Sequence, residues 1–203
     1  MFIATTVDME KYITNFFNEI NSHLKLVSPV EIAKGLKILG ATYERDGRIY
    51  VIGNGGSLAI ARHFVGDLNK TVFSRHLDKK IKRFQAIALP TTDSELTAWA
   101  NDIGYDMVFA GPLKNYIQET DTLVAISASG NSPNIIKAVK VAKEFGIPVI
   151  ALTGFDGGKL LPLADAKIFV STEKGKYEIV ESIHEIICHL ITKYFQELIS
   201  NRI

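Results

Sequence analysis

The sequence predicts an α/β fold: a doubly wound sheet of five parallel strands, flanked by helices and preceded by an N-terminal helical hairpin. Two observations carry this prediction. From residue 48 onward, short apolar runs alternate with helical stretches, and none of the runs alternates cleanly between polar and apolar residues. Continuous apolar strands are typical of a parallel sheet that helices cover on both faces. We expect the five strands at residues 48–52, 85–89, 122–126, 148–153 and 167–170.

Two helices are expected before the first strand. Apolar residues recur at spacings of three and four between residues 13 and 24, which indicates one amphipathic helix. Ser28-Pro29 breaks the chain, and a second helical pattern runs to Asp46-Gly47. We interpret the chain as a single domain, 1–203, made of a helical pair, 1–46, and an α/β core, 47–203. Within the core, helices are expected at about 57–69, 92–118, 133–145, 157–163 and 176–200.

Composition excludes several classes of protein. The chain has 203 residues, and its 23 basic and 22 acidic side chains give a net charge of +1, so no nucleic-acid partner is implied. No apolar run approaches the roughly 18 residues of a membrane span, and the first twenty residues lack the pattern of a signal peptide. Cys188 is the one cysteine, which excludes an internal disulfide and suits the cytoplasm.

Two loops rich in glycine and serine are expected to form a phosphate site. In a doubly wound sheet, ligands bind beyond the carboxyl ends of the strands. The first strand leads into GNGGS at 53–57, where Ser57 is expected to cap the following helix. The third strand leads into SASGNSP at 127–133, where Ser132 fits the N-cap and Pro133 the first helical position. Hydroxyls and amide groups at a helix N-terminus suit a phosphoryl group.

Candidate acid–base groups lie on two of the expected helices. His63 and Asp67 are four residues apart and share a helical face. Glu181 and His189, on the last helix, are eight residues apart and can face one cleft from positions two turns apart. A carboxylate and an imidazole can move a proton between neighbouring carbons. They can equally hold a zinc ion, or serve only as exposed acids beside a hydrogen-bonded histidine.

These motifs resemble the sugar isomerase (SIS) family, whose sheet is flavodoxin-like, and within it the phosphoheptose isomerase branch. The resemblance covers about residues 45–195 and follows the order of the family. It is carried by GNGGS at 53–57, HF at 63–64 with DL at 67–68, ANDIGY at 100–105, SASGNS at 127–132, LTG at 152–154 with DGGK at 156–159, and ESIH at 181–184 leading to His189.

The resemblance implies an aldose–ketose isomerase that converts sedoheptulose 7-phosphate to a D-glycero-heptose 7-phosphate for lipopolysaccharide or capsule. It implies Asp67 and His189 as the acid–base pair, and a homotetramer with its active sites between subunits. The zinc ligands that it implies are His63, Asp67, Glu181 and His189. The substrate-binding residues that it implies are Asn54, Gly55, Ser57, Asp102, Ser127, Ser129, Ser132, Glu178 and Glu181.

The chain departs from the family pattern at three of the implied site residues and at one residue of the serine-rich loop. Asp67 stands where Glu is usual, Glu181 where Gln is usual, Glu178 where Asp is usual, and Ala128 where Thr or Ser is usual. Three alternatives therefore stay open: an isomerase of another sugar phosphate, a sugar-phosphate sensor without turnover, and a non-catalytic SIS protein that binds a protein partner, as the DnaA-initiator-associating proteins do. His189 argues against the partner-binding alternative.

Overall fold

A computed structural model describes residues 8–202 and contains the expected five-stranded sheet. All strands are parallel, in the order β2-β1-β3-β4-β5. The strands are β1 (Arg48–Gly53), β2 (Gln85–Ala88), β3 (Thr122–Ser127), β4 (Val149–Phe155) and β5 (Ala166–Ser171). The strand order reverses direction between β1 and β3, so the loops that leave these two strands meet at the carboxyl edge of the sheet.

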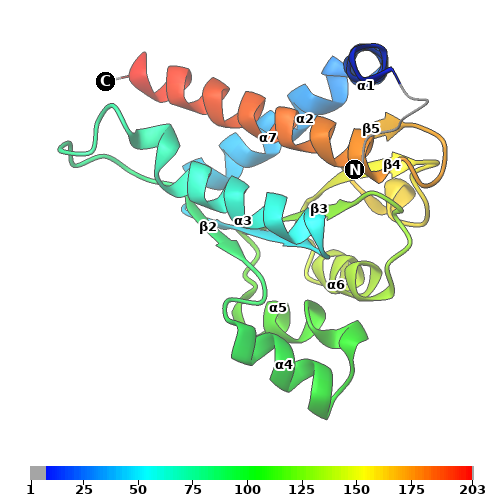
Figure 1. Cartoon of the computed structure of the whole chain (residues 1–203). Helices are drawn as coiled ribbons and strands as arrows, with labels where there is room; N and C mark the ends of the chain where they lie inside the picture. Colours follow the sequence, from blue (N-terminus) through cyan, green and yellow to red (C-terminus); the bar gives the residue numbers. More distant parts are fainter. Residues whose placement is uncertain (1–7, 203) are drawn as a thin grey trace.

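Helices cover both faces of the sheet, as Figure 1 shows. Ile49 and Val51 of β1 pack on one side, and Tyr50 and Ile52 pack on the other, so the doubly wound prediction is confirmed. The first face carries α2 (Pro29–Glu44), α3 (Gly56–Asn69) and α7 (Tyr177–Ser200). The second face carries α4 (Asp93–Asp102), α5 (Ala110–Tyr116) and α6 (Pro133–Glu144).

Strand β5 differs from the expected continuous apolar run. Ala166, Ile168 and Val170 are buried, whereas Lys167 and Ser171 are exposed. The alternation follows from the position of β5 at the edge of the sheet, where only one face is covered. The three strands β1, β3 and β4 lie inside the sheet and are buried almost throughout, as the sequence predicts.

The expected bounds of two helices are wrong. The helix expected over 92–118 is divided into α4, a 3-10 turn at Tyr105–Met107, and α5, because the chain reverses at Gly104 with φ 134°. The helix expected over 157–163 is only a 3-10 turn at Leu161–Leu163. Gly157 and Gly158 both have positive φ, which a right-handed helix does not allow.

Helix α1 (Met9–Leu24) lies on the outside of the molecule and contributes no fully buried residue. Phe16, Ile20 and Leu24 pack partly against the core. The opposite side of the helix exposes apolar side chains to solvent, namely Met9, Tyr12, Ile13 and Phe17. Among residues 8–202, no helix has both the length and the apolar character that crossing a membrane requires.

Candidate active site

The two loops enclose a cavity of about 130 Å³ at the carboxyl edge of the sheet. Gly53, at the end of β1, is paired with Ile126 of β3, and this register brings the loop after each strand to the same place. We call this cavity the cradle. It is lined by Asn54, Ser57, Ile126, Ser127, Ala128, Ser129, Ser132, Tyr177 and Glu181.

The serine hydroxyls of the cradle are arranged as donors. Ser127 Oγ accepts the backbone N–H of Gly130 at 3.2 Å, and Ser129 Oγ accepts that of Asn131 at 3.2 Å. A hydroxyl that accepts one hydrogen bond still has its own proton to give. Ser132 occupies the N-cap of α6 as predicted, and its hydroxyl makes no capping bond. These three hydroxyls can therefore donate to an anion.

The serine loop is supported by the glycine turn that follows β4. Gly130 has φ 60°, and a Cβ at this position would lie 2.1 Å from the carbonyl oxygen of Gly157. The backbone N–H of Leu160 donates to the carbonyl of Gly130 at 2.9 Å. The two backbones interlock at a distance that only glycine permits. The DGGK sequence at 156–159 thus holds the shape of the serine loop.

The prediction that Ser57 caps α3 is wrong. The helix begins at Gly56, and Gly55 occupies the N-cap position with φ 53°, a conformation that glycine adopts without strain. Ser57 is instead buried in the first turn, where it borders the cradle. Its hydroxyl therefore lies beside a ligand site rather than at the helix end.

Glu181 reaches the cradle from the first third of α7. A Cβ on Gly56 would lie 2.4 Å from Glu181 Oε2, so the carboxylate lies against the first turn of α3. Partial burial raises the pKa of this carboxyl above its usual value. The substrate-binding role of Glu181 that the resemblance implied stays a prediction, and the structure places its carboxylate at the cradle.

Asp67 lies between two imidazoles. Its Oδ2 is 3.9 Å from Nε2 of His63 and 4.0 Å from Nε2 of His189, which confirms that His63 and Asp67 share a face. Thr192 Oγ1 lies 3.4 Å from the same oxygen and 2.9 Å from the carbonyl oxygen of Cys188, which is the nearer acceptor for its one proton. The Asp67 side chain is 13% exposed, whereas both histidines are 53% exposed. A carboxylate at the floor and imidazoles at the rim can together move a proton.

Three donor atoms above Asp67 lie close enough to share a cation. They belong to His63, Glu185 and His189, and lie within 4.8 Å of one another. Glu185 Oε1 is 2.5 Å from Nδ1 of His63 and 3.3 Å from Nε2 of His189. Two imidazoles and a carboxylate fit the ligand preference of zinc. We call these three residues the His/Glu/His group.

The His/Glu/His group overlaps only partly with the ligands that the resemblance implied. His63 and His189 belong to it, Asp67 lies beneath it, and Glu181 lies in the cradle, outside the group. Sequence reasoning did not select Glu185. Its spacing of four residues before His189, on the same helix, was the available signal.

The remaining predicted residues lie elsewhere. Asp102 ends α4 and accepts a bond from Asn101, and Glu178 lies in the first turn of α7. Both side chains are exposed, and neither lines the cradle. Sequence reasoning missed Tyr177, which lines the cradle and packs its ring against Phe155 at a centroid distance of 4.9 Å.

Comparisons with known proteins show what the chain is similar to. Residues 14–154 match a family model described as the SIS domain. The chain is 35% identical over 165 residues to a phosphoheptose isomerase of Helicobacter pylori strain Shi470, covering 81% of this chain and 82% of that protein. It is 40% identical over 157 residues to a phosphoheptose isomerase of Mycobacterium bovis, covering 77% and 76%. The solved phosphoheptose isomerase of Neisseria gonorrhoeae superposes with a TM-score of 0.81 at 29% identity, covering 94% of this chain and all of that one.

Proposed function

Since the chain belongs to the SIS domain family, in its phosphoheptose isomerase branch, we propose that it interconverts sedoheptulose 7-phosphate and a D-glycero-heptose 7-phosphate. One observation supports this function above the others: a donor-rich anion cradle and an Asp67–His189 pair lie at two places along the seam between α3 and α7, where α7 contributes Glu181 to the cradle and His189 to the pair. Glu181 in the cradle and His189 are eight residues apart, about 12 Å along the helix axis. An extended seven-carbon sugar with its phosphate is of comparable length.

The reaction needs two proton transfers between carbon and a side chain. With the phosphate held in the cradle, one group of the Asp67–His189 pair removes a proton from C1 of the ketose, and O2 gains a proton to give the enediol. Loss of the O1 proton and return of a proton to C2 then give the aldose. Because the phosphate is remote from C1, its binding energy positions the reacting carbons between Asp67 and His189.

The donor atoms of the His/Glu/His group fit a zinc ion, and we propose that His63, Glu185 and His189 would hold one. When bound, such an ion supplies a Lewis acid for the sugar oxygens. Asp67 remains beneath the group with an oxygen about 4 Å from each imidazole, so this chain keeps a carboxylate for proton transfer.

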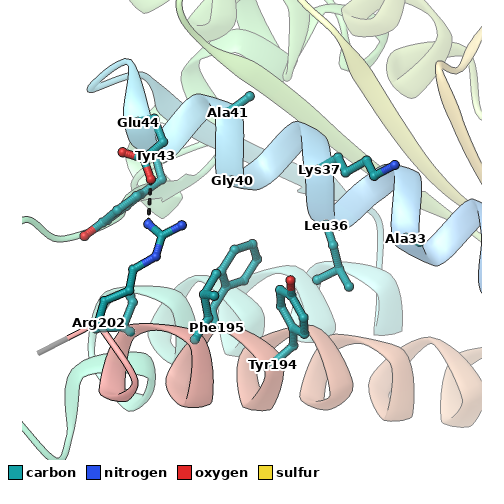
Figure 2. A pocket seen from close by; sticks show the side chains of 12 residues that line it. Ala33, Leu36, Lys37, Gly40, Ala41, Tyr43, Glu44, Tyr194, Phe195 and Arg202 are labelled. Atoms are coloured by element: carbon teal, nitrogen blue, oxygen red, sulfur yellow. Dashed lines mark hydrogen bonds and ion pairs between the residues drawn. The ribbon is translucent and has the colours of Figure 1, made fainter.

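We assign the chain to a homotetramer with active sites between subunits. Two exposed apolar surfaces support this assembly, and a second copy of the chain is the partner that we assign to both. One is the outer side of α1, with Tyr12, Ile13 and Phe17. The other is a groove of about 390 Å³ between α2 and the end of α7, into which Leu36 and Tyr194 project (Figure 2).

The reaction belongs in the cytoplasm, where the buried, unpaired thiol of Cys188 stays reduced. The product is expected to enter heptose synthesis for lipopolysaccharide or capsule.

The first test is a proton NMR time course of the purified protein with sedoheptulose 7-phosphate in D₂O, with and without zinc. A heptose anomeric signal with deuterium at C2 is expected. His189→Gln and Asp67→Asn are each expected to lower kcat by about 100-fold or more, because each loses one proton-transfer group. His76→Asn is the matched histidine control, since His76 bonds to Ser200 far from the site.

Three outcomes separate the alternatives. If a different sugar phosphate in a substrate panel is turned over instead, that sugar phosphate would replace sedoheptulose 7-phosphate as the proposed substrate. Thermal stabilisation by sedoheptulose 7-phosphate without deuterium exchange would favour the sensor. If sedoheptulose 7-phosphate is not turned over and does not stabilise the protein, the assignment would move to a protein that binds a protein partner.

A further inference from the structure

Two asparagine side chains join the loops that form the cradle. Asn54 follows β1, and Asn134 lies in the first turn of α6. Asn54 Nδ2 donates to Asn134 Oδ1 at 3.0 Å, and Asn134 Nδ2 donates to Asn54 Oδ1 at 2.9 Å. Asn134 is 2% exposed and Asn54 is partly buried, so the pair is a part-buried link between the two loops.

The backbone of α6 determines how this pair is oriented. Asn134 Oδ1 also accepts the backbone N–H of Ile135 at 2.9 Å. A backbone N–H can only donate, so the amide oxygen of Asn134 must lie at this end, opposite Asn54 Nδ2, and its NH₂ group must lie opposite Asn54 Oδ1. Asn54 must then place its own oxygen opposite the NH₂ group of Asn134.

Tyr105 adds a second constraint on Asn54. Its hydroxyl donates to Asn54 Oδ1 at 3.0 Å, so that oxygen accepts two hydrogen bonds and its acceptor capacity is filled. Tyr105 is held there by the turn at Gly104, with φ 134°, and by the neighbouring ion pair of Asp106 with Lys137.

One N–H of the Asn54 amide group donates no hydrogen bond among the described residues. Nδ2 carries two hydrogens, and within residues 8–202 it donates one hydrogen bond, to Asn134. Asn54 lines the cradle, and it also lines a neighbouring cavity of about 300 Å³ that contains Tyr105 and Asn134. Asn134 and Tyr105 do not line the cradle themselves. Asn54 is therefore the residue through which the side chains of Asn134 and Tyr105 contact the lining of the cradle.

We propose that Asn134 and Tyr105 are positioning residues that hold the Asn54 amide with its N–H, and not its oxygen, available to the phosphate of the substrate. The inference rests on the proposed function. A phosphate dianion offers only acceptors, so an amide turned the other way would bring two oxygens together. The filled oxygen and the free N–H of Asn54 are the arrangement that an anion requires.

The test is a set of double-mutant cycles on kcat and KM for sedoheptulose 7-phosphate. Asn134→Ala is expected to raise KM about tenfold, because a hydrogen bond to a charged group is lost for much of the time, with kcat changed less than about threefold. Tyr105→Phe is expected to raise KM by a smaller factor, about threefold. In an Asn54→Ala background neither substitution should raise KM further.

The controls separate positioning from general damage. Tyr116→Phe removes an exposed phenol hydroxyl on α5 and should leave KM unchanged. Thermal unfolding of each variant checks the fold. If Asn134→Ala does not fold, Tyr105→Phe still carries the cycle, since it removes one hydroxyl from an exposed side chain.

The outcomes are distinct. Equal KM increases in the wild-type and Asn54→Ala backgrounds would overturn the inference, because the residues would then act independently of Asn54. If the wild type does not turn over, the proposed function fails, and the same cycle is read by calorimetry with inorganic phosphate. Loss of phosphate affinity that depends on Asn54 would support the inference, and a wild type that binds no phosphate would overturn it.

Discussion

His184 and His189 lie five residues apart on α7, yet their surroundings are opposite. His189 is half exposed beside Asp67, whereas His184 is fully buried and its Nε2 lies 3.2 Å from the carbonyl of Thr153. Since a carbonyl only accepts, Nε2 carries the proton and Nδ1 does not. Nδ1 has no partner among the described residues. A second proton on this ring would have to be added inside the core.

This burial predicts how stability depends on pH. Desolvation lowers the pKa of His184 to about 4, against about 6.5 in the unfolded chain. Below pH 6.5 the unfolded state binds a proton that the folded state does not, so stability is fully present above that pH and is lost as pH falls toward 4. The loss at this one group is about 3 kcal/mol. Urea unfolding between pH 7 and pH 4 measures it.

His184→Asn should flatten the pH dependence of unfolding in this range, because an amide does not titrate there. If the variant does not fold, NMR titration of the His184 ring in the wild type gives the same information. A ring that titrates near pH 6.5 in the folded protein would contradict the prediction.

Glu185 is the second prediction at the residue scale. Its carboxylate lies within hydrogen-bond distance of both imidazoles of the His/Glu/His group. Glu185→Gln keeps the shape but removes the charge, and we expect zinc affinity to fall at least about tenfold. Titration calorimetry of the protein with zinc chloride measures this without substrate. Glu197→Gln, at an exposed position on the same helix, is the matched control. Equal affinities for Glu185→Gln and the wild type would exclude Glu185 as a ligand.

Residue spacing predicted only part of this site. The spacing of four between His63 and Asp67 determined that they share a face, because neighbours on one helix are set by its period. The spacing of eight between Glu181 and His189 allowed one cleft but did not decide whether their side chains meet there. The packing of α7 on α3 decides that, since Glu181 lies against Gly56 while His189 lies near His63.

At the scale of elements, the sequence predicted what depends on local pattern. All five strands and the parallel sheet followed from apolar runs bounded by turns. The expected helix over 92–118 was too long because Gly104 and a 3-10 turn interrupt a segment with helical composition. The link between Asn54 and Asn134, 80 residues apart, had no local pattern and depends on strand order.

Gly130 offers a test of how two loops support each other. Gly130→Ala introduces a left-handed alanine and places its Cβ 2.1 Å from a backbone oxygen, so the serine loop or the glycine turn must move. We expect lower stability, by about 2 kcal/mol or more, and a raised KM for the sugar phosphate. Gly146→Ala is the matched control, because Gly146 also has positive φ, 71°, but no atom lies within 4 Å of its Cβ position. If both variants lose the same stability in urea, the interlock contributes nothing.

At the scale of the whole molecule, the apolar surfaces lie away from the cradle. The outer side of α1 exposes Tyr12, Ile13 and Phe17, and the groove of Figure 2 lies at the end of α7 opposite the cradle. Single exposed apolar residues are ordinary in monomers, whereas α1 has apolar side chains on its outer side as well as on its packed side, and this supports the proposed assembly. Helix α7 packs on both α1 and α3, so in the proposed assembly a contact on α1 would reach the proposed catalytic pair through α7.

The last prediction tests that assembly. Phe17→Glu places a charge on the exposed side of α1 and should shift the protein from tetramer to smaller species, because burying an unpaired carboxylate in an interface costs several kcal/mol. Light scattering coupled to size exclusion gives the mass. Phe145→Glu, at the C-cap of α6 on the other side of the sheet, is the aromatic control and should leave the mass unchanged. A Phe17→Glu protein that keeps the wild-type mass would show that α1 faces solvent in the assembly. If the Phe17→Glu protein keeps its fold but has a lower mass and no turnover, the active site needs a neighbouring subunit to be complete.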